Sequence, residues 1–177
     1  MCEAMDMLKK WYIKGIGILL ILLFSFLLGK LFYYYQQQRT IDLVNRELQF
    51  SGLKLMMDLE EIQNTSNDYD IYSVIDGYIV DFENIDLRAH IFSLVNEKSR
   101  YHNKVVYINT WNTEHQLFGY SMYTPIETKM KVLKKHGFKY KDERMEYLTK
   151  YGINIRVDSQ SHIILWIDNP DNYMGSW

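Results

Sequence analysis

The longest apolar segment of the chain lies near its N-terminus. From Gly15 to Gly29 there is no charged residue, and Ser25 is the only hydroxyl-bearing residue. Such a run would span roughly 22 Å as a helix, which is short of the roughly 30 Å hydrocarbon core of a bilayer. Counted from Trp11 to Tyr35 the segment has 25 residues, enough to span with some tilt. We therefore predict a transmembrane signal-anchor helix over residues 12–35, after a short tail at residues 1–11.

Both flanks of this segment carry side chains that suit the surface of a membrane. Aromatic rings lie at headgroup depth, and lysines extend their ammonium groups there while their stems stay in apolar surroundings. The residues expected at the membrane interface are Trp11, Tyr12, Lys14, Lys30, Tyr33, Tyr34 and Tyr35. A cleaved signal peptide is the competing interpretation, but no small-x-small cleavage site follows the apolar run. A buried soluble helix is disfavoured because this run leaves no polar face.

The distribution of lysine and arginine predicts the orientation. Three lysines precede the span, namely Lys9, Lys10 and Lys14, whereas Lys30 and Arg39 follow it. Because cytoplasmic flanks carry the excess of basic residues, the N-terminus is expected in the cytoplasm. The chain from residue 36 onward would then lie in the periplasm or outside the cell. This pattern predicts a single-pass protein of the inner (plasma) membrane.

A helical pattern continues beyond the span. The apolar residues Ile41, Val44, Leu48, Leu55 and Ile62 follow a spacing of three and four, which predicts a membrane-proximal helix over residues 36–63. Packing of this helix on its own domain is favoured over a coiled coil, because a coiled coil needs a longer repeat. Residues 64–177 are expected to form one exported domain.

Several segments of that domain show strand patterns. The run from Ile71 to Phe82 flanks Asp76-Gly77, a pair that type I′ hairpins prefer. A second hairpin is predicted from residues 105–111 and 116–123, and a third from residues 153–157 and 162–167. Residues 85–97 fit either a helix or a strand, and we favour a helix. The fold class is therefore α+β, with an antiparallel sheet of hairpins and 3–4 helices on one face.

Two helices are expected in the second half of the domain. Thr124-Pro125-Ile126-Glu127 has the sequence of a helix start, with threonine as cap, proline in the first turn and glutamate completing a capping box. Gly137 is placed to end that helix in a left-handed conformation. A second short helix is predicted over residues 142–151.

The charges of the exported part fall into two blocks. Residues 55–87 contain nine acidic residues and no basic residue, whereas residues 129–150 contain eight Lys or Arg and three acidic residues. The blocks either bind an oppositely charged partner or face each other and water within the fold. The residues proposed to bind a partner are Asp58, Glu60, Glu61, Asp68, Asp70, Lys131, Lys134 and Lys135.

The sequence contains no recognisable catalytic, cofactor or metal motif. Cys2 is the only cysteine and precedes the span, so the exported part has neither a disulfide framework nor a cysteine metal site. The five histidines do not have a metal-ligand spacing, and no phosphate-binding loop occurs. We therefore expect no catalytic residue, cofactor or metal. The acidic balance of the exported part argues against nucleic-acid binding.

Three functions remain as hypotheses. The favoured one is a non-enzymatic interaction module, an accessory subunit of an envelope machine or the partner of a membrane regulator. It would contact the lipid bilayer and either another envelope protein or a second copy. The alternative is a membrane-anchored immunity protein that binds an envelope-acting toxin. The third is a small-ligand sensor or enzyme, in which His90, His115 or His162 would line a pocket beside a carboxylate.

Overall fold

The computed structural model describes residues 2–65, 68–74, 77–92, 98–140, 147–157 and 162–168 of the 177-residue chain. It divides into two compact units, Met1–Gln38 and Arg39–Trp177, which are described separately below. The terms "sheet" and "core" refer to the second unit throughout.

The first unit is part of one long helix, α1, which extends from Cys2 to Glu47. Residues 12–35 are helical throughout, as the apolar pattern predicts. Among the described residues, α1 is the one helix that is long and apolar enough to cross a membrane, and its most apolar window is not buried. Leu20 and Phe24, for example, are 60% and 63% exposed. This helix is compatible with a single-pass membrane protein.

The predicted membrane-proximal helix over residues 36–63 is wrong as a single element. Helix α1 ends at Glu47 and is followed by strand β1, Leu48–Gln49, and by a separate helix α2, Leu59–Thr65. The chain reverses at Ser51 and Gly52, whose φ angles are 51° and 88°. Glycine tolerates this left-handed conformation, so Gly52 marks a turn where the periodicity suggested a continuous helix.

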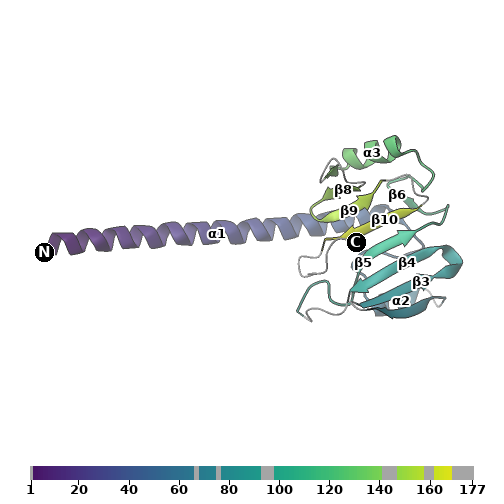
Figure 1. Ribbon diagram of the computed structural model, residues 1–177, viewed down its shortest axis with the longest axis horizontal. Coiled ribbons are helices and arrows are strands. Elements are labelled where there is room, and N and C mark those ends of the chain that lie inside the picture. The colour runs from purple at the N-terminus through teal and green to yellow at the C-terminus, as the bar shows by residue number, and fades with distance from the viewer. Residues whose placement is uncertain are drawn as a thin grey trace. The chain divides into compact units, whose positions relative to one another are not determined.

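The second unit is built on an antiparallel sheet of eight strands (Figure 1). Their order across the sheet is β2-β3-β4-β5-β10-β9-β8-β7, and β1 and β6 form a separate two-stranded sheet. The strands of the large sheet are β2 (Asp70–Val74), β3 (Gly77–Phe82), β4 (Leu87–Phe92), β5 (Lys104–Thr110), β7 (Lys139–Tyr140), β8 (Tyr147–Lys150), β9 (Ile153–Arg156) and β10 (Ile163–Ile167). A short 3-10 helix, η1 (Glu83–Ile85), connects β3 to β4.

Two of the three predicted hairpins are confirmed. Strands β2 and β3 pair directly, and so do β9 and β10. In the first hairpin Val74 pairs with Gly77, so residues 75–76 connect the strands and Gly77 already belongs to β3. The predicted turn at Asp76-Gly77 is therefore displaced by one residue. Residues 75–76 and 158–161, which connect the two hairpins, lie outside the described part of the chain.

Two segments predicted to be helical are strands. Residues 87–92 form β4 between β3 and β5, and residues 147–150 form β8 between β7 and β9. Residues 85–97 fit either periodicity, whereas residues 142–151 were predicted only as a helix. In both segments, pairing with two neighbouring strands outweighs the local pattern. Residues 93–97 and 142–146 of these two predictions lie outside the described residues.

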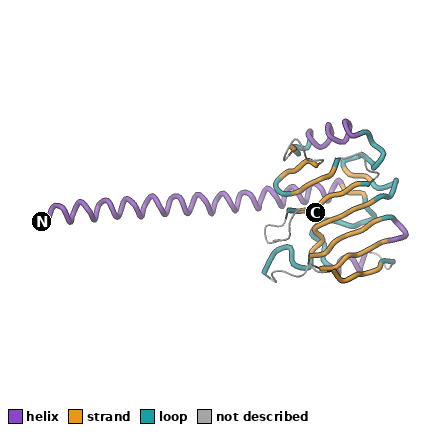
Figure 2. Tube along the Cα trace, in the orientation of Figure 1, coloured by secondary structure: helices purple, strands orange, loops and turns teal. Residues whose placement is uncertain are grey.

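The second predicted hairpin is wrong, because β5 does not pair with the segment that follows it. Strand β6, Gln116–Leu117, pairs with β1 instead. The chain then reverses at Phe118 and Gly119, which have φ angles of 51° and 76°, and Leu117 and Tyr120 exchange both backbone hydrogen bonds. The segment after β5 thus pairs with β1, while the strands of the large sheet lie side by side (Figure 2).

Helix α3, Ile126–Lys135, begins two residues after Thr124 and ends as predicted before Gly137, whose φ is 84°. The predicted capping box is wrong, because no side chain caps α3 and the Thr124 hydroxyl instead accepts a hydrogen bond from the Ser121 N–H. The capping box lies at α2. There Asp58 and Glu61 each accept a hydrogen bond from the other's backbone N–H, at 2.9 and 2.8 Å. The described residues form three α-helices, so only two accompany the sheet besides α1.

Candidate functional site: the open face of the sheet

The two faces of the large sheet differ in burial and chemistry. One residue from each of six central strands forms a fully buried aliphatic row, which consists of Val80, Ala89, Ile108, Leu165, Ile155 and Leu148. Because successive side chains point to opposite faces, their sequence neighbours form a second row across all eight strands. We call the sheet surface that carries this row the open face. The row consists of Tyr72, Ile79, His90, Tyr107, Trp166, Asn154, Thr149 and Lys139.

The helices of the second unit pack on the aliphatic face. Ile41 and Val44 of α1, Ile62 of α2 and Leu133 of α3 belong to the same core cluster as the buried row. In Figure 1 the strands lie in front of helix α2 and of the C-terminal end of α1. No described helix covers the open face. Within the described residues this face is one side of a single layer, in which Tyr107 and Trp166 are half-buried and Asn154 is fully buried.

Aromatic side chains are concentrated at the centre of the open face. Tyr107 of β5 and Trp166 of β10 are directly paired at the middle of the sheet and are both half-buried. Tyr147 of β8 packs edge-on against Trp166, with ring centroids 5.0 Å apart. The guanidinium of Arg88 lies 5.7 Å from the ring centre of Trp111, just beyond the end of β5. Tyr, Trp and Arg are the residues most enriched in the energetically important part of protein interfaces.

Two arginines lie on either side of this aromatic centre. Burial raises the pKa of the Tyr107 hydroxyl, and the positive charges of Arg156 and Arg88 act in the opposite direction. Both guanidinium groups are therefore within electrostatic range of Tyr107. Arg88 is held by Asp81, whose nearly buried carboxylate accepts hydrogen bonds from Nε, at 3.0 Å, and from Nη2. The Arg88–Asp81 pair is thus fixed in position.

The two edges of the open face carry opposite charges. Strands β2 and β3 with η1 contain Asp70, Asp81 and Glu83 and no basic residue, and nearby Asp70 raises the pKa of Tyr72. At the opposite edge, strands β7, β8 and β9 contain Lys139, Lys150 and Arg156 and no acidic residue. Side-chain alternation places Asp70 and Asp81, as well as Lys139 and Arg156, on the open face.

The acidic residues proposed to bind a partner lie in two separate places. Asp58, Glu60 and Glu61 belong to the start of α2, and the Asp58 carboxylate also binds Lys104 Nζ at 3.2 Å. The backbone N–H of Glu61 and the Lys104 ammonium lower the pKa of Asp58. Asp68 accepts a hydrogen bond from Asn84, and Asp70 is exposed in the edge strand β2. The helix cap thus explains Asp58 and Glu61, whereas Asp70 belongs to the open face.

The basic candidates lie on α3. Lys131, Lys134 and Lys135 are exposed, and the ammonium of Lys134 lies 5.2 Å from the ring centre of Tyr140 in β7. They therefore extend the basic edge that Lys139 begins. Lys129 of the same helix is buried and donates a hydrogen bond to the Met122 carbonyl at 2.8 Å.

Two of the three histidines named in the enzyme hypothesis, His90 and His115, lie on opposite faces of the sheet. His90 belongs to the open face, whereas His115 is buried on the opposite side and stacks on Phe50 at 5.2 Å. The Thr110 hydroxyl donates to the Asp86 carbonyl, so it accepts from His115 Nδ1–H at 2.6 Å. His115 Nε2 then accepts from the Ser51 hydroxyl at 3.1 Å. This network connects the turn after β1 to the end of β5, and burial lowers the pKa of His115.

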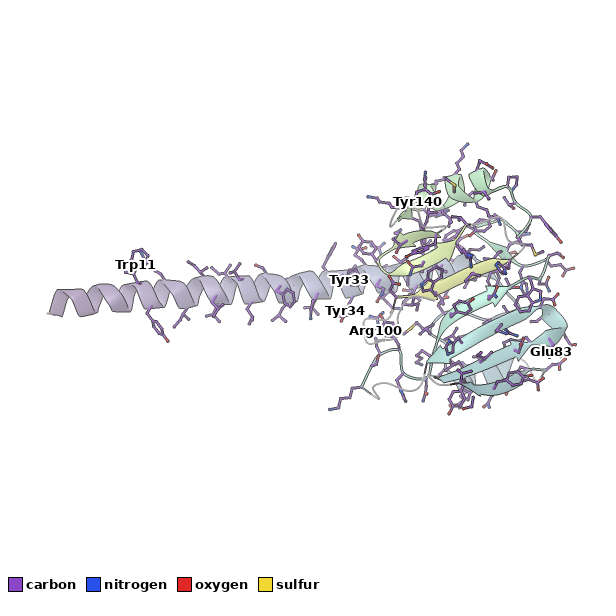
Figure 3. The ribbon with its side chains drawn as sticks, viewed as in Figure 1. Trp11, Tyr33, Tyr34, Glu83, Arg100 and Tyr140 are labelled. Atoms are coloured by element: carbon purple, nitrogen blue, oxygen red, sulfur yellow. The ribbon has the colours of Figure 1, made fainter. Side chains whose placement is uncertain are left out.

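The residues expected at the membrane interface all lie along α1 (Figure 3). Trp11 and Tyr12 are 72% and 73% exposed at one end of the apolar segment. Tyr33, Tyr34 and Tyr35 follow one another at its other end, which places them on different sides of the helix. Lys30 extends back over the ring of Phe26, with Nζ 4.8 Å from the ring centre.

Comparisons with known proteins add no assignment. No protein-family model, curated protein or solved structure matches this chain. Within the described residues, no group of three His, Cys, Asp or Glu side chains is placed to hold a metal ion. The open face therefore has to be interpreted from its own geometry.

Sequence reasoning did not find the open face. The aromatic residues of this region differ in burial, namely Tyr107, Trp111, Phe118, Tyr120 and Tyr123. Phe118 and Tyr120 are buried, but Tyr107 and Trp111 are only half-buried and Tyr123 is 68% exposed. Alternation along residues 104–110 places Tyr107 opposite to Ile108, which is the one signal that separates the two faces. This alternation identifies a surface only when residues 87–92 and 147–150 are also known to be strands of the same sheet.

Proposed function

We propose that this protein is a single-pass membrane protein whose exported domain is a non-enzymatic protein-interaction module. Residues 12–35 anchor it in the inner (plasma) membrane, with the N-terminus in the cytoplasm. The domain that follows binds another envelope protein or a second copy through the open face. The observation that carries the proposal is a sheet surface rich in Tyr, Trp and Arg that no described helix covers.

The chemistry of the open face supports recognition of a protein. Tyrosine and tryptophan contribute large contact areas at a low cost in side-chain entropy, and their polar groups can still form hydrogen bonds. Arg88 is already fixed by Asp81, so a partner meets a preorganised cation beside an aromatic ring. The apolar helix supports the anchor, because apolar side chains exposed on all sides require an apolar environment.

A binding experiment tests the interaction. The full-length protein, tagged at its C-terminus, is solubilised from membranes in mild detergent and its bound partners are recovered. We expect Tyr107→Ala to lower the recovery of any partner at least tenfold, since central aromatic residues cost about 2 kcal/mol or more when truncated. The matched control is Tyr123→Ala, because Tyr123 is an exposed tyrosine outside the open face. Equal recovery with both variants, or recovery of an unassociated monomer, contradicts the proposal.

Reporter fusions test the anchor and its orientation. A reporter that is active only outside the cytoplasm is joined after Trp177, and a cytoplasm-only reporter is joined at the same position in a parallel fusion. We expect activity from the first reporter alone. Activity from the second alone would invert the topology. A mature protein that begins near Leu31 would identify the apolar segment as a cleaved signal.

A further inference from the structure

We infer that the molecule bound to the open face is a second copy of this chain, arranged as a face-to-face dimer with a two-fold axis parallel to the strands. This inference rests on the proposed function and names the partner. It follows from the opposite charges at the two edges of the sheet, together with an aromatic pair at its centre.

The symmetry of the charges selects this axis. A two-fold axis parallel to the strands that passes between β5 and β10 places each strand over its counterpart at the opposite side of the sheet. Strand β2 of one copy then lies over β7 of the other, and β3 over β8, by the order of the strands. Asp70 at the acidic edge of each copy approaches the basic edge that contains Lys139 in the other. An axis perpendicular to the strands would instead place β2 over β2 and bring like charges together.

The centre of the sheet fits the same arrangement. The axis passes between the neighbouring residues Tyr107 and Trp166. The Tyr107 ring of each copy therefore lies over the Trp166 ring of the other copy. Four aromatic rings thus form the middle of the interface, and the charged edges form its rim. This is the usual distribution of protein interfaces, with large aromatic residues at the centre and charged residues around them. By the same register, Arg156 of one copy lies over Arg88 of the other, and Asp81 balances the charge of Arg88.

The available area is sufficient for a stable dimer. With about 3.3 Å per residue and about 4.8 Å between strands, the eight strands cover roughly 600 Å² of flat area. This area lies at the lower end of standard interfaces, which bury about 800 Å² per partner. Two sheets stacked at about 10 Å would enclose the aromatic rings between them. The pair would form a sandwich in which the helices of each copy remain on its outer side.

Cross-linking through introduced cysteines tests the axis. The exported part contains no cysteine, so Cys2→Ser in the full-length protein gives a background without thiols. Two differently tagged chains are co-expressed in membranes, one with Ile79→Cys in β3 and the other with Thr149→Cys in β8. A short bismaleimide is required because stacked sheets lie farther apart than a disulfide can bridge. We expect a cross-link that joins the two tags, and we expect either variant expressed alone to give at least tenfold less dimer.

A charge exchange tests the complementary edges. Lys139→Glu and Asp70→Lys are each expected to weaken dimerisation roughly threefold to tenfold, because each pair occurs twice in a two-fold dimer. The variant that carries both changes is expected to regain most of the loss. Dimer formation is measured by sedimentation of the detergent-solubilised chain, and thermal unfolding checks that each variant is folded.

Three outcomes would overturn the inference. Efficient self-cross-linking of Ile79→Cys would place β3 over β3 and exclude the proposed axis. A monomeric mass without any cross-link would exclude self-association. Recovery of a different protein that depends on Tyr107, with no dimer present, would also exclude the second copy while leaving the proposed function intact. Loss of both self-association and partner recovery would remove the proposed function as well.

Discussion

The two faces of the eight-stranded sheet carry side chains from the same strands but differ in burial and chemistry. Ile108 and Tyr107 are neighbours in β5, but Ile108 is fully buried against the helices whereas Tyr107 is half-buried on the open face. The aliphatic face holds the domain together through the burial of apolar area. The aromatic face keeps rings, guanidinium groups and carboxylates in fixed positions without burying them completely. Stability and recognition can therefore be changed independently by substitutions one residue apart.

The largest expected loss of stability comes from truncating a side chain on the aliphatic face. Ile108→Ala should lower the free energy of unfolding by about 2–5 kcal/mol, because it leaves a cavity in the core. Tyr107→Ala should lower it less, since Tyr107 is only half-buried, but it should abolish most partner binding. Urea unfolding of the full-length protein in detergent, followed by tryptophan fluorescence, measures the first effect. A smaller loss for Ile108→Ala than for Tyr107→Ala would show that the faces have been assigned the wrong way round.

The next effect concerns the charged pair on the open face. Arg88→Ala leaves the Asp81 carboxylate, whose side chain is 9% exposed, without its cation. We expect a loss of about 1–3 kcal/mol in the free energy of unfolding, less than for a fully buried pair because Arg88 itself is half-exposed. Asp81→Asn with Arg88→Ala should recover part of this loss, because the unpaired charge is then removed. If Arg88→Ala alone is neutral, the pair does not fix the open face.

A smaller effect is expected at α2, whose Ile62 packs under the sheet. Asp58→Ala removes the helix cap and the ion pair with Lys104, and should lower the free energy of unfolding by about 0.5–2 kcal/mol. The neighbouring Glu60→Ala serves as the control, because Glu60 is exposed and should stay within about 0.5 kcal/mol of the wild type. The pKa of Asp58 is lowered in the folded state, so its contribution is present above pH 3.8 and is lost as the pH falls through the folded value. Equal losses for both variants would argue against a specific cap.

The smallest expected effect is the pH dependence of the free energy of unfolding that the buried His115 causes. Burial lowers the pKa of His115 from 6.5, so the unfolded chain binds the proton first as the pH falls. The free energy of unfolding should therefore decrease below about pH 6.5, and this decrease should stop once the folded protein also binds the proton. His115→Gln should remove this part of the pH dependence. Unfolding midpoints measured between pH 7 and pH 5 give the comparison, and an unchanged slope in His115→Gln would contradict it.

Local patterns along the chain predict the features that depend on neighbouring residues. An apolar run without charge predicts the helix over residues 12–35, because backbone groups in an apolar medium must pair within the segment. The hairpins β2–β3 and β9–β10 were also predicted, since neighbouring strands separated by a short polar connection pair with each other. The C-terminal end of α3 at Gly137 follows from the left-handed conformation that glycine allows.

The tertiary structure decided the features that depend on distant neighbours. Residues 87–92 fit two periodicities and residues 147–150 were predicted to be helical, and pairing on both sides makes both segments strands. Strand β6 pairs with β1, nearly seventy residues earlier in the chain, which no local pattern reveals. The open face consists of one residue from each of eight strands, so it exists only once the strand order is known. Its charged edges come from segments far apart in the sequence, because antiparallel pairing places the acidic and basic blocks at opposite sides of the same sheet.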